Sequence, residues 1–226
     1  MRVVAASCAA LVACTCAFAQ VAPSPAEVAG YADLFAAASR GDAAGIAKLA
    51  AGGADVRARD GHGRTPLHVA AFAGHHDAMR ALVRAGADPN ALENDRYDIV
   101  TIAAVADDPP TLVVALRIGG RATNVTSRYD GTALIAAAHL GHDAVVGELI
   151  RAGAPLDHVN NLGWTALIES IVLGNGAARH TATLKALVDA GANVNLADRG
   201  GATPLQLAKA RGYREMVALL EKAGAR

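Results

Sequence analysis

The sequence predicts an all-α solenoid, a stack of helix–turn–helix units joined by hairpin-like loops. Composition is the first observation behind this prediction: 53% of the 226 residues are hydrophobic, yet three Phe, four Tyr and one Trp are the whole aromatic content, and alanine fills 55 positions. Alanine favours helix, and small side chains let helices approach closely. The second observation is a threonine-led pattern that returns at near-constant spacing, which indicates a repeat architecture.

The charge balance argues against one class of function. Lys+Arg and Asp+Glu both number 21, so the formal net charge is zero. Proteins that track nucleic-acid phosphates carry a clear basic excess. We therefore expect no nucleic-acid partner.

The first 19 residues predict an export signal. Arg2 precedes an uncharged stretch from Val3 to Phe18, which ends in Ala17-Phe18-Ala19 before Gln20. One cation, a short apolar run and an A-x-A exit are typical of a secretory signal peptide, here cleaved between Ala19 and Gln20. The stretch is too short for a membrane span of about 20 residues, and no other segment predicts a span.

A lipid anchor is the alternative for this segment. Leu11-Val12-Ala13-Cys14 resembles the lipobox of bacterial lipoproteins, in which Cys14 would be lipidated. All three cysteines lie before Ala19, so the cleaved chain would hold no disulfide and no thiolate metal site. Residues 20–30 contain Pro23 and Pro25 and predict an extended linker.

Six units follow between residues 31 and 226. Their starts lie near Ala32, Thr65, Asp98, Thr132, Thr165 and Thr203, and from Thr65 onward they are 33, 34, 33 and 38 residues apart. Threonine caps the start of a first helix, and proline is tolerated in its first turn, as in Thr65-Pro66-Leu67-His68. Glycine then ends that helix, because a left-handed backbone costs glycine least. One such unit cannot bury its apolar face alone, so the six form one domain.

These motifs resemble the ankyrin repeat family, over roughly residues 31–226. The resemblance implies stacked helical units and a protein-binding role without catalysis. The sequence contains no G-x-S-x-G elbow, no Walker loop and no G-x-G-x-x-G after a strand. We therefore expect no enzyme activity and no cofactor.

Two units depart from the pattern. In the third, Asp107-Asp108-Pro109-Pro110 replaces the Gly-His turn, and Asp108 is expected to cap the second helix with Pro109 at its first position. In the fifth, five extra residues fall within 174–183 and predict a longer turn between the helices. Sequence drift or a partner-specific protrusion would explain either departure.

The eight histidines do not form a metal motif. The resemblance implies local hydrogen bonding for His68 and a place in the Gly-His turn for His75 and His142. The other five are scattered over different units, without an H-E-x-x-H or Cys/His cluster. We expect no bound metal.

The resemblance also implies that a partner protein contacts the loop tips and the exposed side of the first helices. At the loop tips the candidates are Arg64, Tyr97, Arg128, Tyr129, Trp164 and Arg199. On the first helices they are Phe72, Val105, His139, Leu140, Val172, Leu173 and Arg211. Aromatic and arginine anchors beside apolar neighbours are typical of interface hot spots. For Tyr97 and Trp164, simple packing against the next helix is the alternative.

These inferences together predict an exported, monomeric scaffold that binds another protein, with the bacterial periplasm as its compartment. Two alternatives stay open. The chain could be secreted as an effector that binds a host protein, or it could serve as an accessory or protective subunit of a periplasmic enzyme. The sequence does not name the partner, since a fold does not fix function.

Overall fold

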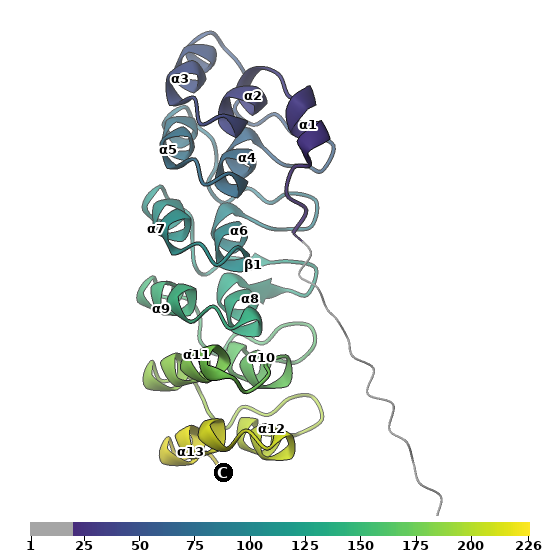
Figure 1. Cartoon of the computed structure of the whole chain (residues 1–226), viewed down its shortest axis with the longest axis vertical. Helices are drawn as coiled ribbons and strands as arrows, with labels where there is room; N and C mark the ends of the chain where they lie inside the picture. Colours follow the sequence, from purple (N-terminus) through teal and green to yellow (C-terminus); the bar gives the residue numbers. More distant parts are fainter. Residues whose placement is uncertain (1–19) are drawn as a thin grey trace, which may run out of the picture.

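The structure, a computed structural model, describes residues 20–226 and is a stack of helix pairs (Figure 1). The predicted signal peptide, its predicted cleavage site after Ala19 and the alternative lipidation site at Cys14 lie outside the described residues. The first helices form one column: α2 (Asp33–Ser39), α4 (Pro66–Phe72), α6 (Ile99–Val105), α8 (Ala133–Leu140), α10 (Ala166–Val172) and α12 (Pro204–Arg211). The second helices form the other: α3 (Ala43–Ala51), α5 (His76–Arg84), α7 (Pro109–Arg117), α9 (Asp143–Arg151), α11 (Ala178–Asp189) and α13 (Arg214–Lys222).

The first helices begin at the residues where the repeat pattern starts. The side chains of Asp98, Thr132, Thr165 and Thr203 each accept a hydrogen bond from the backbone N–H three residues on, which satisfies one of the free donors at a helix start. Ala32 holds this position in the first unit and offers no such bond. Before α8, strands β1 (Val125–Thr126) and β2 (Gly131–Thr132) pair antiparallel, with Val125 opposite Thr132.

The core is continuous through the stack. Small alanines lie where the helices meet, and Ala70, Ala104 and Ala137 are fully buried. Leucines such as Leu134 and Leu149, also fully buried, fill the space between the two columns. Each unit thus depends on its neighbours for burial, as expected of a solenoid.

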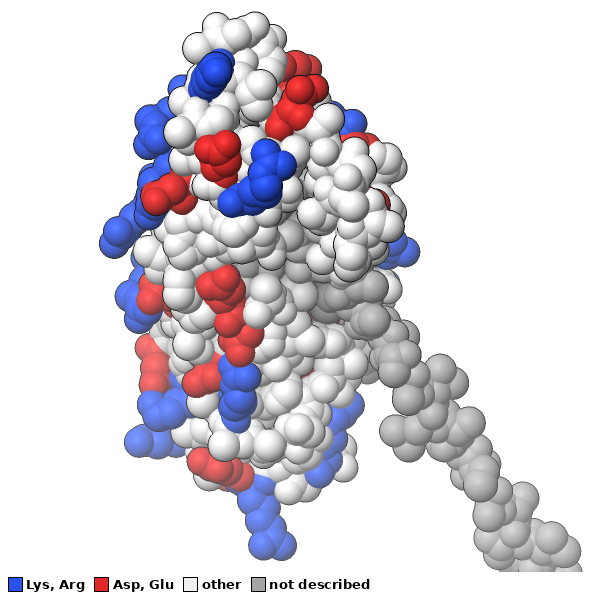
Figure 2. Space-filling view, turned by 45° about the horizontal axis from the view of Figure 1, so that its top comes forward, with Lys and Arg blue, Asp and Glu red and all other residues white. Residues whose placement is uncertain are grey.

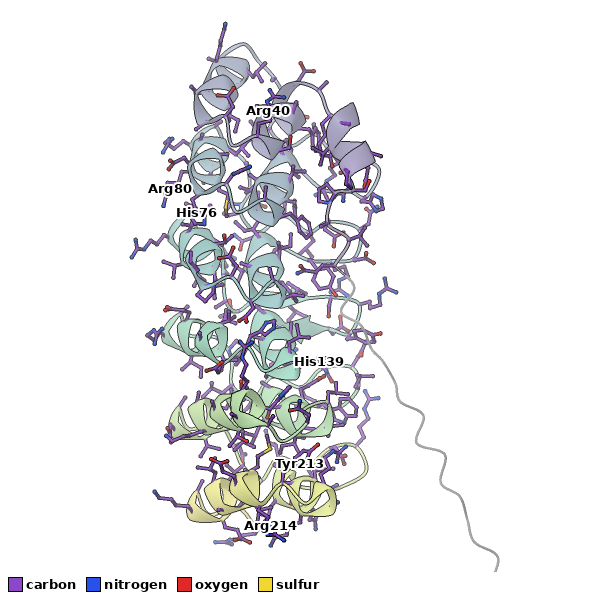
Figure 3. All side chains as sticks on the ribbon, in the orientation of Figure 1. Arg40, His76, Arg80, His139, Tyr213 and Arg214 are labelled. Atoms are coloured by element: carbon purple, nitrogen blue, oxygen red, sulfur yellow. The ribbon has the colours of Figure 1, made fainter. Side chains whose placement is uncertain are left out.

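Hydrogen bonds from the turns join neighbouring units. In four units, a side chain at the turn between the two helices, or in the first turn of the second helix, donates to a carbonyl at the end of the first helix of the preceding unit. These bonds run from His75 Nε2 to Ser39 (3.1 Å), from His142 Nδ1 to Ala104 (2.9 Å), from His180 Nε2 to His139 (3.0 Å) and from the Tyr213 hydroxyl to Gly174 (3.0 Å). Figure 3 shows His139 near the end of α8 and Tyr213 in the turn between α12 and α13. This assigns His75 and His142 the turn positions that the sequence predicts.

The third unit forms the turn between its two helices without the Gly-His pair. Asp107 takes the left-handed conformation (φ +54°) that Gly74 adopts in the second unit. Asp108 then caps α7, accepting a 3.0 Å bond from the Thr111 N–H, and Pro109 follows at the first helical position. The predicted cap is confirmed.

The five extra residues of the fifth unit are divided between the turn and the second helix, whereas the prediction places them in the turn alone. The turn before α11 is longer, but α11 itself also grows to twelve residues, where the other second helices have nine. Its added turn carries Arg179, which binds Asp107 (2.7 Å) and Asp143 (3.2 Å). The two departures from the repeat are therefore joined by one ion pair.

The extended linker expected over residues 20–30 is in part a helix, α1 (Pro25–Gly30). Ser24 accepts from the Glu27 N–H (3.3 Å) and the Glu27 carboxylate accepts from the Ser24 N–H (2.8 Å), so the helix start is capped on both sides. The prediction is wrong for Pro25–Gly30 because proline is favourable at the first helical position. No helix of residues 20–226 is long and apolar enough to cross a membrane.

Candidate protein-binding face

The inner face, as we use the term, consists of the first helices α2, α4, α6, α8, α10 and α12, the loops that precede them and the residue that directly follows each helix. It carries all thirteen predicted contact residues, but at three levels of exposure. Arg128, Arg199 and Arg211 are exposed, and Arg64 and Tyr97 are buried. The half-buried residues are Phe72, Val105, Tyr129, His139, Leu140, Trp164, Val172 and Leu173.

Arg64 is covered by residues of the chain's own N-terminal segment. Its side chain is fully buried, its Nε donates to Asp60 Oδ2 (2.7 Å), and its guanidinium binds the Glu27 carboxylate. The prediction of an exposed loop-tip arginine is wrong because residues 20–31 lie over it.

The prediction of Tyr97 as a partner contact is also wrong, since only 5% of this residue is exposed. Its backbone N–H donates to Glu93 Oε1 (2.9 Å), and its carbonyl lies 3.2 Å from His68 Nε2. Burial raises the pKa of the Tyr97 phenol to about 12. The packing alternative holds for this residue.

The loops of the third and fourth units are tied together at their tips. Arg96 Nη1 lies 2.8 Å from Asp130 Oδ1, and Arg128 binds Asp95. These pairs are solvent-exposed, so each contributes little to stability. The two pairs connect the loop tips, and Arg128 stays exposed to solvent.

A buried polar cluster supports the face at the fifth unit, and the sequence analysis missed it. Glu169, 1% exposed, lies on α10 with Oε2 3.1 Å from His139 Nδ1 and with Oε1 accepting from Asn160 Nδ2 (2.8 Å). Asn160 Oδ1 accepts from the Leu162 and Trp164 N–H groups, both at 3.0 Å. The cluster therefore positions the loop that carries Trp164. A charged residue where other units have an apolar one, such as Val69, was the available signal.

Apolar side chains line the inner face of the fourth and fifth units. Leu140, Val172 and Leu173 are half-buried, so this patch is less exposed than the sequence predicts. Arg211 Nη2 donates to the Val172 carbonyl (3.3 Å) at the edge of the patch. On the face seen in Figure 2, acidic and basic side chains are interspersed along the stack. This distribution agrees with the zero net charge and gives no large field of one sign.

The histidines and carboxylates of the described residues do not assemble a metal site. Over residues 20–226, no group of three or more His, Cys, Asp or Glu side chains is placed to hold a metal ion. His68 is buried within its own unit: Thr65 donates to its Nδ1 from the N–H (3.1 Å) and the hydroxyl (2.8 Å), and its Nε2 lies 3.0 Å from the Ala91 carbonyl. The implied local role of His68 is confirmed.

Comparisons with known proteins agree with this architecture. Family models for ankyrin repeats match residues 62–94, 100–198 and 176–221. The ankyrin repeat protein YahD of Escherichia coli is 33% identical over 86% of this chain and 96% of its own length. The chain belongs to the ankyrin repeat family.

Solved ankyrin repeat structures superpose on the chain. An ankyrin repeat domain from Acinetobacter baumannii is 44% identical, with a TM-score of 0.80 over 85% of this chain and 98% of that one. The ankyrin repeat domain of Bcl-3, of the IkappaB protein family, is 28% identical, with a TM-score of 0.77 over 87% and 88%. These likenesses support an ankyrin repeat scaffold for protein–protein interaction.

An enzyme also appears among the relatives. L-asparaginase of Dirofilaria immitis is 30% identical over 82% of this ankyrin repeat chain but over 30% of its own length. The likeness therefore concerns a minor part of that enzyme. Ankyrin repeat domains are in general non-enzymatic scaffolds.

Proposed function

We propose that the chain binds another protein through the inner face of its fourth, fifth and sixth units. The observation that carries this proposal is the run of half-buried apolar side chains Leu140, Val172 and Leu173 on consecutive inner helices. Half-buried Trp164 and exposed Arg211 flank it, and apolar centres with aromatic and arginine anchors favour binding hot spots. The first three units do not offer such a free face, because residues 20–31 lie across them.

A preformed surface supports the same role. Buried caps and inter-unit hydrogen bonds hold these inner helices and loops in place before any partner arrives. Little conformational entropy is then lost on binding, which raises the affinity available from a given contact area.

The double variant Leu140→Asp, Leu173→Asp tests this face. We expect it to lose at least tenfold in affinity for the partner recovered with the unaltered protein, since two carboxylates would be desolvated in an apolar contact. The measurement is quantitative co-purification from the native compartment, followed by titration of the recovered partner.

The matched control is Ala144→Asp, Ala218→Asp, which adds the same charge at exposed positions on α9 and α13. Circular dichroism establishes that both variants are folded. Equal partner affinity for the unaltered protein and the Leu140→Asp, Leu173→Asp variant would contradict the proposal.

We further propose that this scaffold is exported to the bacterial periplasm, on the strength of the signal-peptide pattern in residues 1–19. Intact mass of protein from its native host is expected to correspond to a chain beginning at Gln20. A mass for a chain beginning at a lipidated Cys14 would replace signal cleavage by anchoring. The mass of the full chain would contradict export through a cleaved signal.

A further inference from the structure

Residues 20–31 lie across the inner face of the first three units. Gln20 Nε2 donates to the Thr101 carbonyl in α6 (3.0 Å), Arg64 Nη1 donates to the Val21 carbonyl (3.0 Å), and the Tyr31 hydroxyl donates to Asp60 Oδ2 (2.7 Å). In Figure 1, α1 lies beside α2 on the loop side of the stack, and it does not lie beyond α2 and α3 as an end cap would. The segment thus covers a potential binding surface and does not cap the first unit.

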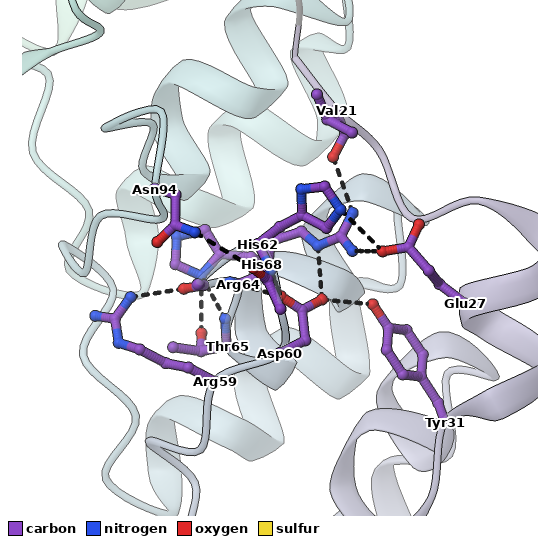
Figure 4. Close-up of polar contacts among 12 residues, drawn as sticks. Val21, Glu27, Tyr31, Arg59, Asp60, His62, Arg64, Thr65, His68 and Asn94 are labelled. Atoms are coloured by element: carbon purple, nitrogen blue, oxygen red, sulfur yellow. Dashed lines mark hydrogen bonds and ion pairs between the residues drawn. The ribbon is translucent and has the colours of Figure 1, made fainter.

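Arg64 is the anchor of this contact (Figure 4). Asp60, from the same loop, accepts from Arg64 Nε and from the backbone N–H groups of His62 (2.9 Å) and Arg64 (3.0 Å). The loop therefore supplies one carboxylate to its own arginine, and Glu27 of the segment supplies the second. His62 Nε2 lies 3.4 Å from Glu27 Oε1. This is a socket for an incoming carboxylate.

Local hydrogen bonds and Arg64 favour the ionised form of both carboxylates at this contact. Hydrogen bonds from Ser24, together with Arg64, lower the pKa of Glu27 to about 2. Although burial raises the pKa of Asp60, hydrogen bonds from Tyr31, Arg64 and His62 hold it below its ordinary value. Both carboxylates are therefore charged at neutral pH.

Polar contacts, more than apolar burial, hold the segment. No residue of α1 is buried, and Val21 and Val28 are 44% and 38% exposed. A cavity of about 190 Å³ remains between the segment and the inner helices, lined by Ala22, Pro23 and Val28 on one side and by residues including Val69 and Phe72 on the other. A segment attached in this way can be displaced at much lower cost than a core helix.

We propose that this surface, formed by the Arg64 socket and the groove beside Phe72, is a docking site for a peptide of a partner protein, and that residues 20–31 occupy it as a built-in competitor. The peptide has the chemistry of the segment: extended residues, a Ser or Thr helix cap, a backbone carbonyl three residues before the cap and a carboxylate three residues after it. This inference goes beyond the proposed function, because it concerns a second site, on the first three units, and names the class of partner for that site.

The tether makes the competition strong. A segment joined to its own site by a short connection acts at an effective concentration of the order of mM. A partner peptide must therefore either bind far more tightly than the segment or bind a chain whose residues 20–31 have already been released from the site. Weakly binding acidic peptides are thus excluded from the site, and peptides with the cap, carbonyl and carboxylate of the segment can bind.

The test uses a fluorescent peptide of residues 20–32 and the chain from Gln20 onward. The protein variant Ser24→Ala, Glu27→Gln removes the cap and the carboxylate of the internal segment, and Glu215→Gln, at an exposed position on α13, is the matched control. We expect the peptide to bind the double variant at least tenfold more tightly than the unaltered protein or the control. A peptide carrying Glu27→Gln should bind the double variant at least tenfold more weakly.

Hydrogen exchange of residues 24–31 separates release of the segment from loss of fold. These amides should exchange faster in the double variant, and faster in the unaltered protein when the peptide is saturating, while the amides of α8 and α10 stay protected. Equal peptide affinity for all three proteins, no binding to a double variant whose segment is released, or unchanged exchange of residues 24–31 would each overturn the proposal. The test at Leu140 and Leu173 addresses other units, so either proposal can fail alone.

Discussion

Replacing Glu169 by alanine is expected to lower the free energy of unfolding by about 3 kcal/mol. The side chain is 1% exposed and accepts from buried Asn160 while facing His139. Its removal leaves a buried amide without an acceptor and opens a cavity, and such losses cost about 1–3 kcal/mol for the polar group alone. Urea unfolding followed by far-UV circular dichroism measures the change.

Two further variants give this prediction its controls. Glu148→Ala removes a partly exposed glutamate on α9 that pairs with Arg151. It should change the free energy of unfolding by no more than about 0.5 kcal/mol. Glu169→Gln keeps an acceptor for Asn160 and should fall between the two. A Glu169→Ala variant as stable as Glu148→Ala would show that the cluster does not hold the fifth unit.

Acidification is expected to destabilise the protein through His68. Burial lowers the pKa of this imidazole to about 4, from an ordinary value of 6.5. The unfolded chain then binds the proton more readily than the folded one between these two values, so stability is fully present above pH 6.5 and falls as the pH drops toward 4. At 1.36 kcal/mol per pH unit the loss reaches about 3 kcal/mol.

The variant His68→Gln isolates this contribution, and the chain itself suggests it. Gln206 holds the same position in the sixth unit, where its Oε1 accepts from the Thr203 N–H at 2.9 Å. Glutamine should therefore keep the helix cap while removing the titrating group. Urea midpoints of both proteins from pH 7 to pH 4 are the measurement. A parallel fall in both would refute the assignment to His68.

Features confined to one repeat were predictable from the sequence. The caps at Thr132 and Asp108, the hydrogen bonds of His68 and the turn positions of His75 all depend on residues within a unit or on its immediate neighbour. Local spacing determines such contacts, so a pattern that repeats reveals them.

Features that depend on distant partners were not predictable in the same way. Arg64 occupies a loop tip in the repeat, but its second carboxylate comes from Glu27, 37 residues earlier in a segment with no repeat pattern. The Glu169 cluster joins α10 to His139, 30 residues away, and to the loop before α10. Periodicity predicts which face a residue occupies, but not which side chain from another segment will cover it.

The placement of residues 20–31 also sets an order of events during folding. The Thr101 carbonyl that receives the Gln20 amide lies 81 residues further along the chain, and the Val21 contact with Arg64 spans 43 residues. The repeats need only adjacent sequence to close their contacts, and local contacts form before distant ones because loop closure costs entropy. Residues 20–31, although synthesised before the repeats, are therefore among the last parts to dock, after the third unit has formed.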